Sequence, residues 1–267
     1  METSTAQLNL IYFSPTGTTQ KIVQSIGREL EIELVNEYNI TSSLFSDFKP
    51  KISKNSITII GLPVYGGRLP NNTINKLMSI QSNGTPVVLL VVYGNRDYDD
   101  SLLELKDIAV KCGFKIIAAA AFVGEHSLST KKKPIAENRP DKDDLLKCRN
   151  FSLKIKDRYT IFINKDSIME VIIPGNSPYK ERKTPPLLSP ETNINTCGQC
   201  KVCEDVCPTN AISFKNGIKT DKELCIWCCA CVKSCPNNSR SFDNPTINGI
   251  SNRLFVACKE RKEPIFY

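Results

Sequence analysis

The feature that most constrains this chain is a run of four cysteines that occurs twice. Each run has the spacing C-x2-C-x2-C-x3-C and is followed at once by a proline. The first run comprises Cys197, Cys200, Cys203 and Cys207, and the second comprises Cys225, Cys228, Cys231 and Cys235. Three thiolates two residues apart on a tight loop can hold three corners of an iron–sulfur cubane, and this spacing is typical of [4Fe–4S] sites. The sequence therefore predicts two [4Fe–4S] clusters.

Structural zinc is the alternative ligand for so many cysteines. Zinc sites favour two separated C-x2-C pairs, whereas each run here has four cysteines and a trailing proline. In two-cluster proteins the fourth cysteine of each run binds the other cluster. We therefore expect the following sets: Cys197, Cys200, Cys203 and Cys235 for one cluster, and Cys225, Cys228, Cys231 and Cys207 for the second.

The segment of about residues 191–240 resembles the bacterial two-cluster ferredoxins. Cys229 lies inside the second run outside its spacing, so we expect it to pack and not to ligate. Ile226 and Trp227 lie between ligands, and they either shield a cluster from water or pack the small core. The other cysteines are expected to behave as small hydrophobic residues: Cys112, Cys148 and Cys258.

The first part of the chain alternates apolar runs with amphipathic stretches. Residues 8–13, 56–62, 85–93 and 114–123 predict buried strands, and residues 31–38 predict an edge strand. Helical patterns cover residues 19–30, 71–80, 99–112 and 141–158. Strand and helix in alternation predict an α/β fold with a doubly wound, parallel, five-stranded sheet, followed by a small α+β cysteine-rich domain.

A loop of hydroxyl residues and glycine follows the first predicted strand. It reads Ser14-Pro15-Thr16-Gly17-Thr18-Thr19 and precedes a predicted helix. Free N–H groups and the helix dipole make such a place favourable for an anion. The loop has neither the Walker lysine nor a G-x-G-x-x-G pattern, which disfavours a nucleoside triphosphate or a dinucleotide. A helix cap without a ligand is the structural alternative.

Two further loops follow the third and fourth predicted strands. In a doubly wound sheet, ligands bind outside the carboxyl ends of the strands, so these loops are expected beside the hydroxyl loop. Tyrosines can flank a flat ring, and glycines let the backbone approach its polar edge. A flat ring with a phosphate is a description of FMN. The candidate ring-binding residues are Pro63, Val64, Tyr65, Gly66, Gly67, Tyr93, Gly94, Asn95, Arg96, Tyr98 and Asp99.

The hydroxyl loop resembles the phosphate loop of the flavodoxin family, [ST]-x-T-G-x-T. The resemblance covers about residues 6–156 and implies that the loop binds the FMN phosphate. It leaves open which of Tyr65, Tyr93 and Tyr98 stacks on the flavin. The matching residues are Ser14, Thr16, Gly17 and Thr19, with Thr18 at the variable position.

A flavodoxin-like half joined to a ferredoxin-like half resembles the EFR1-like flavodoxin–ferredoxin fusion proteins. We expect an FMN-binding domain over residues 1–158 and a two-cluster domain with a tail over residues 191–267. Between them, residues 159–190 are predicted to form a β-hairpin (159–173, turning near Asn164–Asp166) and a proline-rich linker. His126 is expected at the same rim as the flavin, as a proton donor or as a structural residue.

Composition limits the other possibilities. The chain has 267 residues, a net charge of +7 and one histidine, which disfavours His-rich metal sites and Ser-His-Asp chemistry. We expect no secretory signal and no membrane span, hence a cytoplasmic protein, where cysteines are seldom paired in disulfides. Lys131–Lys133 lacks the interleaved aromatic residues of a nucleic-acid site and is interpreted as a solvated face or a docking site for an acidic partner.

These features predict an electron-transfer protein that links two [4Fe–4S] clusters to FMN. The expected partner is a redox protein, such as a ferredoxin acting as a low-potential donor. The alternative is a ferredoxin-wired, FMN-dependent reductase of a small substrate, such as a quinone, a nitro compound or an enoate. A redox or oxygen sensor is a third possibility, ranked last because the sequence shows no signalling output.

Overall fold

The computed structural model describes residues 6–42, 50, 52–165, 169–214 and 217–267. The largest unit is a sheet with the strand order β10-β5-β4-β3-β1-β2. Neighbouring strands from β2 to β5 pair in parallel, and β10 pairs antiparallel with β5. The strands are β1 (Gln7–Tyr12), β2 (Leu34–Asn39), β3 (Ser56–Pro63), β4 (Pro86–Tyr93), β5 (Lys115–Val123) and β10 (Ile265–Phe266).

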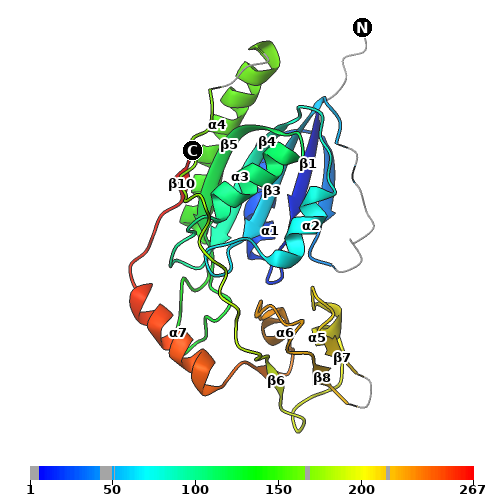
Figure 1. Ribbon diagram of the computed structural model, residues 1–267, viewed down its shortest axis with the longest axis vertical. Helices are drawn as coiled ribbons and strands as arrows, with labels where there is room; N and C mark the ends of the chain where they lie inside the picture. Colours follow the sequence, from blue (N-terminus) through cyan, green and yellow to red (C-terminus); the bar gives the residue numbers. More distant parts are fainter. Residues whose placement is uncertain (1–5, 43–49, 51, 166–168, 215–216) are drawn as a thin grey trace.

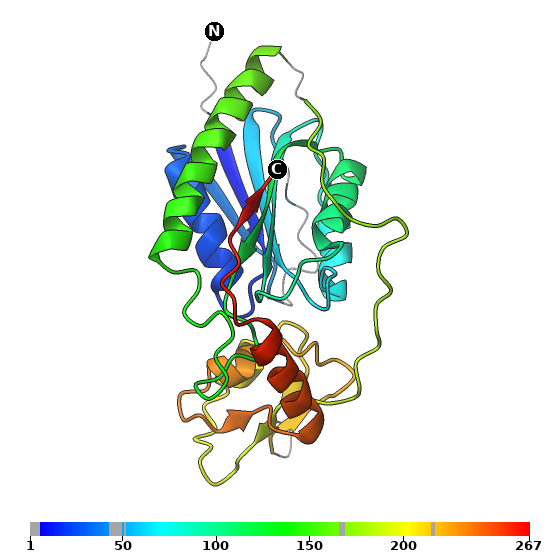
Figure 2. The same ribbon diagram turned by 90° about the vertical axis from the view of Figure 1, so that its left-hand side faces the viewer.

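Helices cover both faces of this sheet. Helices α1 (Thr18–Glu29) and α4 (Lys142–Lys165) lie on one face, and α2 (Asn71–Met78) and α3 (Ser101–Lys111) lie on the other (Figure 2). The order β2-β1-β3-β4-β5 is the flavodoxin-like one, with a switch point between β1 and β3. The predicted doubly wound parallel sheet is confirmed, and residues 31–38 contain most of an edge strand, β2.

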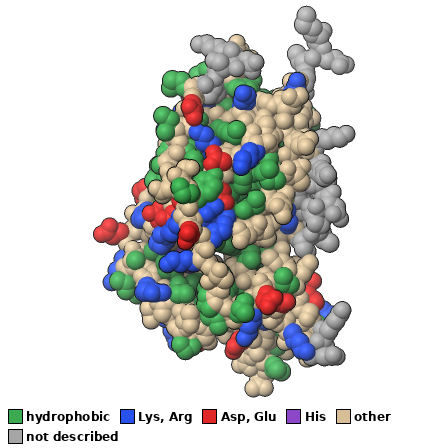
Figure 3. Space-filling view, in the orientation of Figure 1, with side chains coloured by type: hydrophobic (Ala, Val, Ile, Leu, Met, Phe, Trp, Pro, Cys, Tyr) green, Lys and Arg blue, Asp and Glu red, His purple; other side chains and the backbone are tan. Residues whose placement is uncertain are grey.

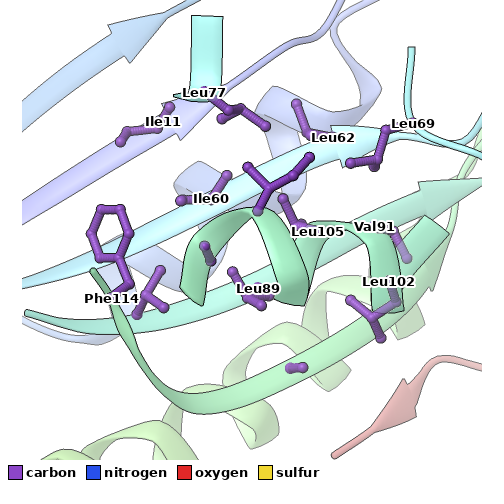
Figure 4. Close-up of a cluster of buried hydrophobic side chains, with 14 of the residues drawn as sticks. Ile11, Ile60, Leu62, Leu69, Leu77, Leu89, Val91, Leu102, Leu105 and Phe114 are labelled. Carbon is purple, nitrogen blue, oxygen red and sulfur yellow. The ribbon is translucent and has the colours of Figure 1, made fainter. Parts of the chain in front are cut away.

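Each face of the sheet has its own hydrophobic core. Figure 4 shows the core on the α2 and α3 face, where Leu102 and Leu105 of α3 pack toward Leu89 and Val91 of β4. The opposite core lies between the sheet and helices α1 and α4. Strand β4 is buried along its whole length, which explains why its sequence is a continuous apolar run.

A smaller, cysteine-rich domain lies beyond the carboxyl ends of the parallel strands (Figure 1). Its described residues form two short helices and two 2-stranded sheets, β6 with β9 and β7 with β8. Its elements are β6 (Glu191–Thr192), α5 (Val202–Asp205), β7 (Ile212–Ser213), β8 (Lys219–Thr220), α6 (Ala230–Lys233) and β9 (Arg240–Ser241). The predicted small α+β domain is confirmed.

The prediction of a β-hairpin over residues 159–173 is wrong. Helix α4 continues to Lys165, and Ile155, Tyr159 and Phe162 lie against the core of its face of the sheet. These residues are spaced i, i+4 and i+7, which is the spacing of one helix face. Of the predicted turn, Asn164 belongs to α4, and Asp166 lies outside the described residues.

The tail that was assigned to the cysteine-rich domain returns to the sheet. Helix α7 (Pro245–Ala257) leads away from the cysteine-rich domain, and β10 then pairs Ile265 with Ala121 and Phe266 with Ala120 of β5. The Phe266 ring stacks on Phe151 of α4 at a centroid distance of 4.7 Å. The predicted five-stranded sheet therefore gains a sixth, antiparallel strand. We call residues 6–165 together with β10 the sheet domain.

The linker is attached to the sheet domain along much of its length. Val171 and Ile173 are buried in the core on the α2 and α3 face. Asp100, next to α3, accepts hydrogen bonds from the backbone N–H groups of Asn176 (2.8 Å) and Lys180 (2.6 Å). Charged side chains of both signs lie close together on this face, at the level where the two domains meet (Figure 3). The linker thus restrains the position of the cysteine-rich domain.

Among the described residues, no helix combines the length and the apolar character that a membrane crossing requires.

Candidate functional site

The first set of predicted ligands surrounds one hollow in the cysteine-rich domain. The hollow has a volume of about 320 Å³, including space open to solvent. It is lined by Cys197, Cys200 and Cys203 of the first run and by Cys235 of the second run. Cys200 is exposed, and Lys201 beside it is exposed as well. We call this space hollow 1.

The second set surrounds a hollow of nearly the same size, about 330 Å³. Its walls include Cys225, Cys228 and Cys231 of the second run and Cys207 of the first run. We call it hollow 2. The exchange of the fourth cysteine between the runs is therefore present in the fold. In the described part of the chain, no three His, Cys, Asp or Glu side chains gather closely enough to hold a single metal ion. The thiols stand around each hollow and do not converge on one point.

Backbone N–H groups point at the sulfur atoms in both hollows. Ala211 N–H donates to Cys207 Sγ and Ser239 N–H donates to Cys235 Sγ, both at 3.2 Å. Burial opposes ionisation of Cys235, but the N–H groups of Ser239, Arg240 and Asn237 outweigh it and lower the pKa of this thiol. Such donors favour a thiolate, the form that binds metal.

Several other thiols are too buried to ionise easily without a cation. Burial is the main cause that raises the pKa of Cys203, Cys225 and Cys231, and it raises the pKa of Cys228 to about 12. A bound iron–sulfur core supplies the positive charge that would stabilise these thiolates. The donor set, the N–H groups and the hollows fit a cubane cluster in each place.

A third hollow lies at the carboxyl ends of the parallel strands, where a ligand is expected in this fold. Its volume is about 440 Å³, including space open to solvent. It is formed by the loops that follow β1, β3, β4 and β5. We call it hollow 3. Its predicted lining residues are Ser14, Thr16, Thr18, Thr19, Pro63, Val64, Tyr65, Tyr93, Gly94 and His126, and its unpredicted ones are Pro15, Val92, Gly124, Glu125 and Ser127.

The hydroxyl loop ends at the N-terminus of α1. Gly17 is the N-cap, with φ of 79°, and it has no side chain with which to cap the helix. The first N–H groups of a helix have no partner within it. Ser14 Oγ accepts one of them, from Gln20 at 3.0 Å. The remaining N–H groups and the hydroxyls of Thr16 and Thr18 form a cradle that fits a phosphate.

Two glycines predicted to approach the flavin instead make a turn. Tyr65 and Arg68 exchange backbone hydrogen bonds of 2.9 and 3.2 Å, and Gly66 and Gly67 between them have φ of 62° and 87°. Two positive φ values in the centre are those of a type I′ turn, which explains the glycine pair. These glycines do not line hollow 3, but the turn fixes Tyr65 at its wall.

The second half of the predicted loop 93–99 binds the chain's own tail. Asn95 Nδ2 donates to the carbonyl oxygens of Cys258 (2.9 Å) and Glu260 (2.7 Å), and its Oδ1 accepts from Lys262 N–H at 3.1 Å. The hydroxyl groups of Tyr98 and Tyr267 are hydrogen-bonded to each other. Two more residues of the predicted ring loop, Arg96 and Asp99, form an ion pair with each other and do not line hollow 3. Asp99 also pairs with Lys180 of the linker at 2.9 Å.

His126 lies in the wall of hollow 3 as a neutral imidazole. Burial, with smaller effects of Lys233 and Arg96, lowers its pKa to about 4. Its Nδ1 accepts the N–H of Leu128 at 3.0 Å, so the ring proton belongs on Nε2. A side chain at position 94 would meet the imidazole ring, which is why glycine stands there. His126 is thus suited to donate a hydrogen bond at neutral pH.

Hollows 2 and 3 both lie at the junction of the domains. Tyr65 lines hollow 3, and Cys228 and Cys229 are close enough to add to the rise that burial causes in the pKa of its phenol. Ile226 packs on the core of the sheet domain. Lys233 of α6 forms an ion pair with Glu125, which lines hollow 3. Both cysteines line hollow 2 together with Ile226, so hollow 2 lies on the side of the cysteine-rich domain that packs on the sheet domain.

Between hollows 1 and 2 the structure adds a residue that was not predicted from the sequence. Arg240 is buried, lines hollow 1 and donates to Cys231 Sγ, a member of the hollow 2 set, at 3.5 Å. The sequence did hold a signal for this residue. Arg240 lies five residues after Cys235, whereas the residue five positions after Cys207, the equivalent cysteine of the first run, is the apolar Ile212.

Comparisons with known proteins bear on both domains. Residues 190–213 match the family model described as 4Fe-4S binding domain. No curated protein matches the chain.

Solved structures resemble the sheet domain. A flavodoxin from the domain Archaea is 14% identical, with 58% of this chain and 99% of that chain covered and a TM-score of 0.42. Flavodoxin 2 from Bacillus cereus is 16% identical, with 57% and 99% covered and a TM-score of 0.42. Rubredoxin oxygen:oxidoreductase from Desulfovibrio gigas is 13% identical, with 59% and 37% covered and a TM-score of 0.42. The fold assignment rests on the strand order and on the helices of both faces.

Proposed function

We propose that this protein passes electrons between two [4Fe–4S] clusters and FMN, in the manner expected of an EFR1-like flavodoxin–ferredoxin fusion. The observation that carries the proposal is the contact between the two domains at hollow 3. Ile226, which lines hollow 2, packs on the same core of the sheet domain as Tyr65, which lines hollow 3. Hollow 1 adjoins hollow 2 through Arg240. Three cofactor-sized spaces therefore follow one another through the molecule.

Each cluster would be held by thiolates from both runs. Cys197, Cys200, Cys203 and Cys235 would bind one cluster in hollow 1, and Cys225, Cys228, Cys231 and Cys207 would bind the other in hollow 2. When bound, the clusters supply one-electron exchange and FMN supplies one- or two-electron exchange. The chain's part is to hold the cofactors close together and to set their potentials through burial and hydrogen bonds.

FMN would lie in hollow 3. The hydroxyls of Ser14, Thr16, Thr18 and Thr19, which line hollow 3, and the first N–H groups of α1 would bind its phosphate. Tyr65 and Tyr93 would border the ring, since both line the hollow. His126 would direct its Nε2–H at a ligand in hollow 3 and keep that proton at neutral pH, because its pKa is about 4.

Hollow 1 would take electrons from a low-potential redox protein such as a ferredoxin. Two of its lining residues, Cys200 and Lys201, are exposed, whereas Cys228 of hollow 2 is buried. Electrons would then reach hollow 2 and leave through the flavin. This order follows from exposure alone: the exposed site meets the partner.

A reductase of a small molecule is the second candidate. It is favoured by His126, whose Nε2–H is available in the wall of a hollow that is open to solvent. A substrate above the ring, such as a quinone, a nitro compound or an enoate, could accept that hydrogen bond. The two functions differ in what reoxidises the reduced protein.

The test is an anaerobic reductive titration of the full chain, with iron, flavin and electrons counted together. We expect about eight iron and one FMN per chain, with about four electrons taken up. Thr16→Ala combined with Thr19→Ala should lose FMN and keep the iron, and Lys131→Ala is a matched surface control that keeps both. A chain that binds zinc in place of iron would refute the proposal.

The same reduced protein separates the two candidate functions. We expect fast reoxidation by an oxidised redox protein and slow reoxidation by quinones, nitroaromatics and enoates. Turnover with one of these small molecules, lost in His126→Ala, would favour the reductase.

A further inference from the structure

Arg240 is a buried cation between the two cysteine sets. The residue is 4% exposed. Its Nη1 donates to Thr192 Oγ1 at 2.7 Å, and its Nη2 donates to Thr220 Oγ1 at 3.1 Å and to Cys231 Sγ at 3.5 Å. It also lines hollow 1. One guanidinium therefore contacts a ligand of hollow 2 while it forms part of the wall of hollow 1.

One donor of this guanidinium has no partner. Arg240 Nε is buried and makes no hydrogen bond within the described residues. A buried donor left unpaired is costly, and buried polar groups are nearly always paired in native proteins. Because Arg240 lines hollow 1, an acceptor in that hollow would pair this N–H. The sulfur atoms of a cluster are such acceptors.

The internal repeat of the domain indicates that the arginine is not required by the fold. The two runs are related by a shift of 28 residues, from Cys197 to Cys225 and from Cys207 to Cys235. The same shift relates Ile212 to Arg240. Ile212 is also 4% exposed, and it lines hollow 2 as Arg240 lines hollow 1. The repeat thus accommodates an apolar side chain at this place, and only one of the two copies carries a charge.

We propose that Arg240 raises the reduction potentials of both clusters. The inference rests on the proposed function, because it requires clusters in hollows 1 and 2. A [4Fe–4S] core held by four thiolates is an anion, and each electron added makes its charge more negative. A buried cation stabilises the reduced form more than the oxidised form, and burial weakens screening by solvent. Each cluster takes up one electron, and no bond of the protein is made or broken.

Arginine suits this place better than lysine would. Its guanidinium stays charged and presents several donors in one plane, so it can serve two threonines and a sulfur at once. These bonds offset the cost of burying the charge. The geometry places the same charge at both sets, because Arg240 lines hollow 1 with Cys203 and donates to Cys231 of hollow 2.

The experiment is a redox titration of the loaded, full-length protein with detection by electron paramagnetic resonance. Arg240→Met removes the charge and keeps a long side chain, and Arg240→Gln is a second neutral variant that keeps donors for the threonines. We expect at least a tenfold shift of each cluster's equilibrium toward the oxidised form, which is about 59 mV per one-electron step. Arg240→Lys should stay within threefold of the wild type.

Two controls separate the charge from structural effects. Thr192→Val combined with Thr220→Val removes two partners of the guanidinium but leaves its charge, so the potentials should move less than threefold. Lys201→Met removes an exposed cation from the wall of the same hollow and should also have a small effect, because water screens it.

The outcomes are distinguishable. A wild-type chain without iron would overturn the proposed function itself. Neutral variants with a full complement of iron and unchanged potentials would overturn the role of Arg240 and leave the proposed function intact. If neither neutral variant binds iron, Arg240 is needed for assembly, and the inference is equally overturned. A shift in the threonine variant as large as in Arg240→Met would assign the effect to geometry.

Discussion

Cys200 and Cys228 occupy the same place in the two cysteine runs, yet Cys200 is exposed and Cys228 is buried. The backbone around them is the same. Lys201 and Cys229 follow with φ of 63° and 58° and are the N-caps of α5 and α6. Hollows 1 and 2 have volumes of about 320 and 330 Å³.

The surroundings of the two halves are what differ. Gln199 is exposed, whereas its counterpart Trp227 is partly buried, with its indole N–H donating to the carbonyl of Leu188 at 2.8 Å. Asp205 is exposed, whereas its counterpart Lys233 pairs with Glu125 of the sheet domain. The two halves therefore share a backbone conformation but differ in environment: the first half faces solvent, and the second half contacts the sheet domain. The sequence substitutions between the repeats follow this division.

The largest effects should come from replacing one ligand in each half. Cys200→Ser and Cys228→Ser should each remove about four of about eight iron. Cys228→Ser should in addition weaken FMN binding about tenfold, about 1.4 kcal/mol, because Cys228 lines hollow 2 together with Ile226, which packs on the sheet domain beside hollow 3. Iron analysis and a flavin-binding isotherm measure both effects. Equal FMN affinity in the two variants would show that the second half of the cysteine-rich domain is not coupled to the FMN site more strongly than the first half.

Acid should destabilise the folded protein through His126, which lies where the second half of the cysteine-rich domain contacts the sheet domain. The folded-state pKa of His126, about 4, is below its unfolded value of 6.5, so the folded protein favours the neutral ring. The stability is then fully present above pH 6.5 and is lost as the pH falls toward 4, by about 2 kcal/mol between pH 7 and pH 5. Denaturant unfolding followed by far-ultraviolet circular dichroism measures the loss.

The matched variant for this prediction is His126→Gln. It should flatten the part of the pH dependence that the imidazole causes, and carboxylates account for the remainder. An identical slope in the variant and the wild type would mean that His126 makes no contribution.

Glycine substitutions at the two helix caps should stabilise the domain in one case and not in the other. Both Lys201 and Cys229 have left-handed φ, which costs about 1 kcal/mol for a residue other than glycine. Lys201→Gly should therefore stabilise the domain by up to about 1 kcal/mol, since Lys201 is exposed. Cys229→Gly gains the same relief but loses a side chain that is 3% exposed, so it should be neutral or destabilising. Thermal unfolding of both variants compares them, and stabilisation by Cys229→Gly would indicate loose packing at the junction.

The smallest effect is expected from the ion pair between the domains. Glu125→Gln should cost about 0.5 kcal/mol at low salt, because Lys233 and Glu125 are both partly exposed. The difference from the wild type should vanish at 1 M salt. Asp205→Asn in the first half is the control, and it should show no such salt dependence.

The sequence was most informative where the spacing of cysteines or an uninterrupted apolar run determines the structure. The cysteine spacing predicted both thiol sets, since the fold brings the fourth cysteine of each run to the other hollow. Strands β1, β3, β4 and β5 followed from apolar runs because they are buried on both faces. The position of the hydroxyl loop at the N-terminus of α1 also followed from the sequence, because the loop and the helix are consecutive in the chain.

The sequence was less informative where partners are distant. Asn95 was assigned to the flavin ring, but its partners are Cys258 and Glu260, more than 160 residues away. The error at residues 159–173 has a different cause. Ile161 and Ile163 are β-branched and alternate with Phe162, which favours a strand locally, whereas the contact of Phe162 with the core favours a helix. Tertiary packing outweighed the local propensity.

Strand β10 has a consequence for the order in which the molecule can be built. The edge of β5 and the rings of Phe122 and Phe151 stay uncovered until residues 265–266 have been synthesised, because Phe266 packs against both rings. The cysteine-rich domain emerges from the ribosome before that closure. During that interval the sheet has an open edge at β5, a state in which edge-to-edge association competes with folding. Arrival of the last strand ends that competition, so its two residues protect the chain during synthesis as well as joining its domains.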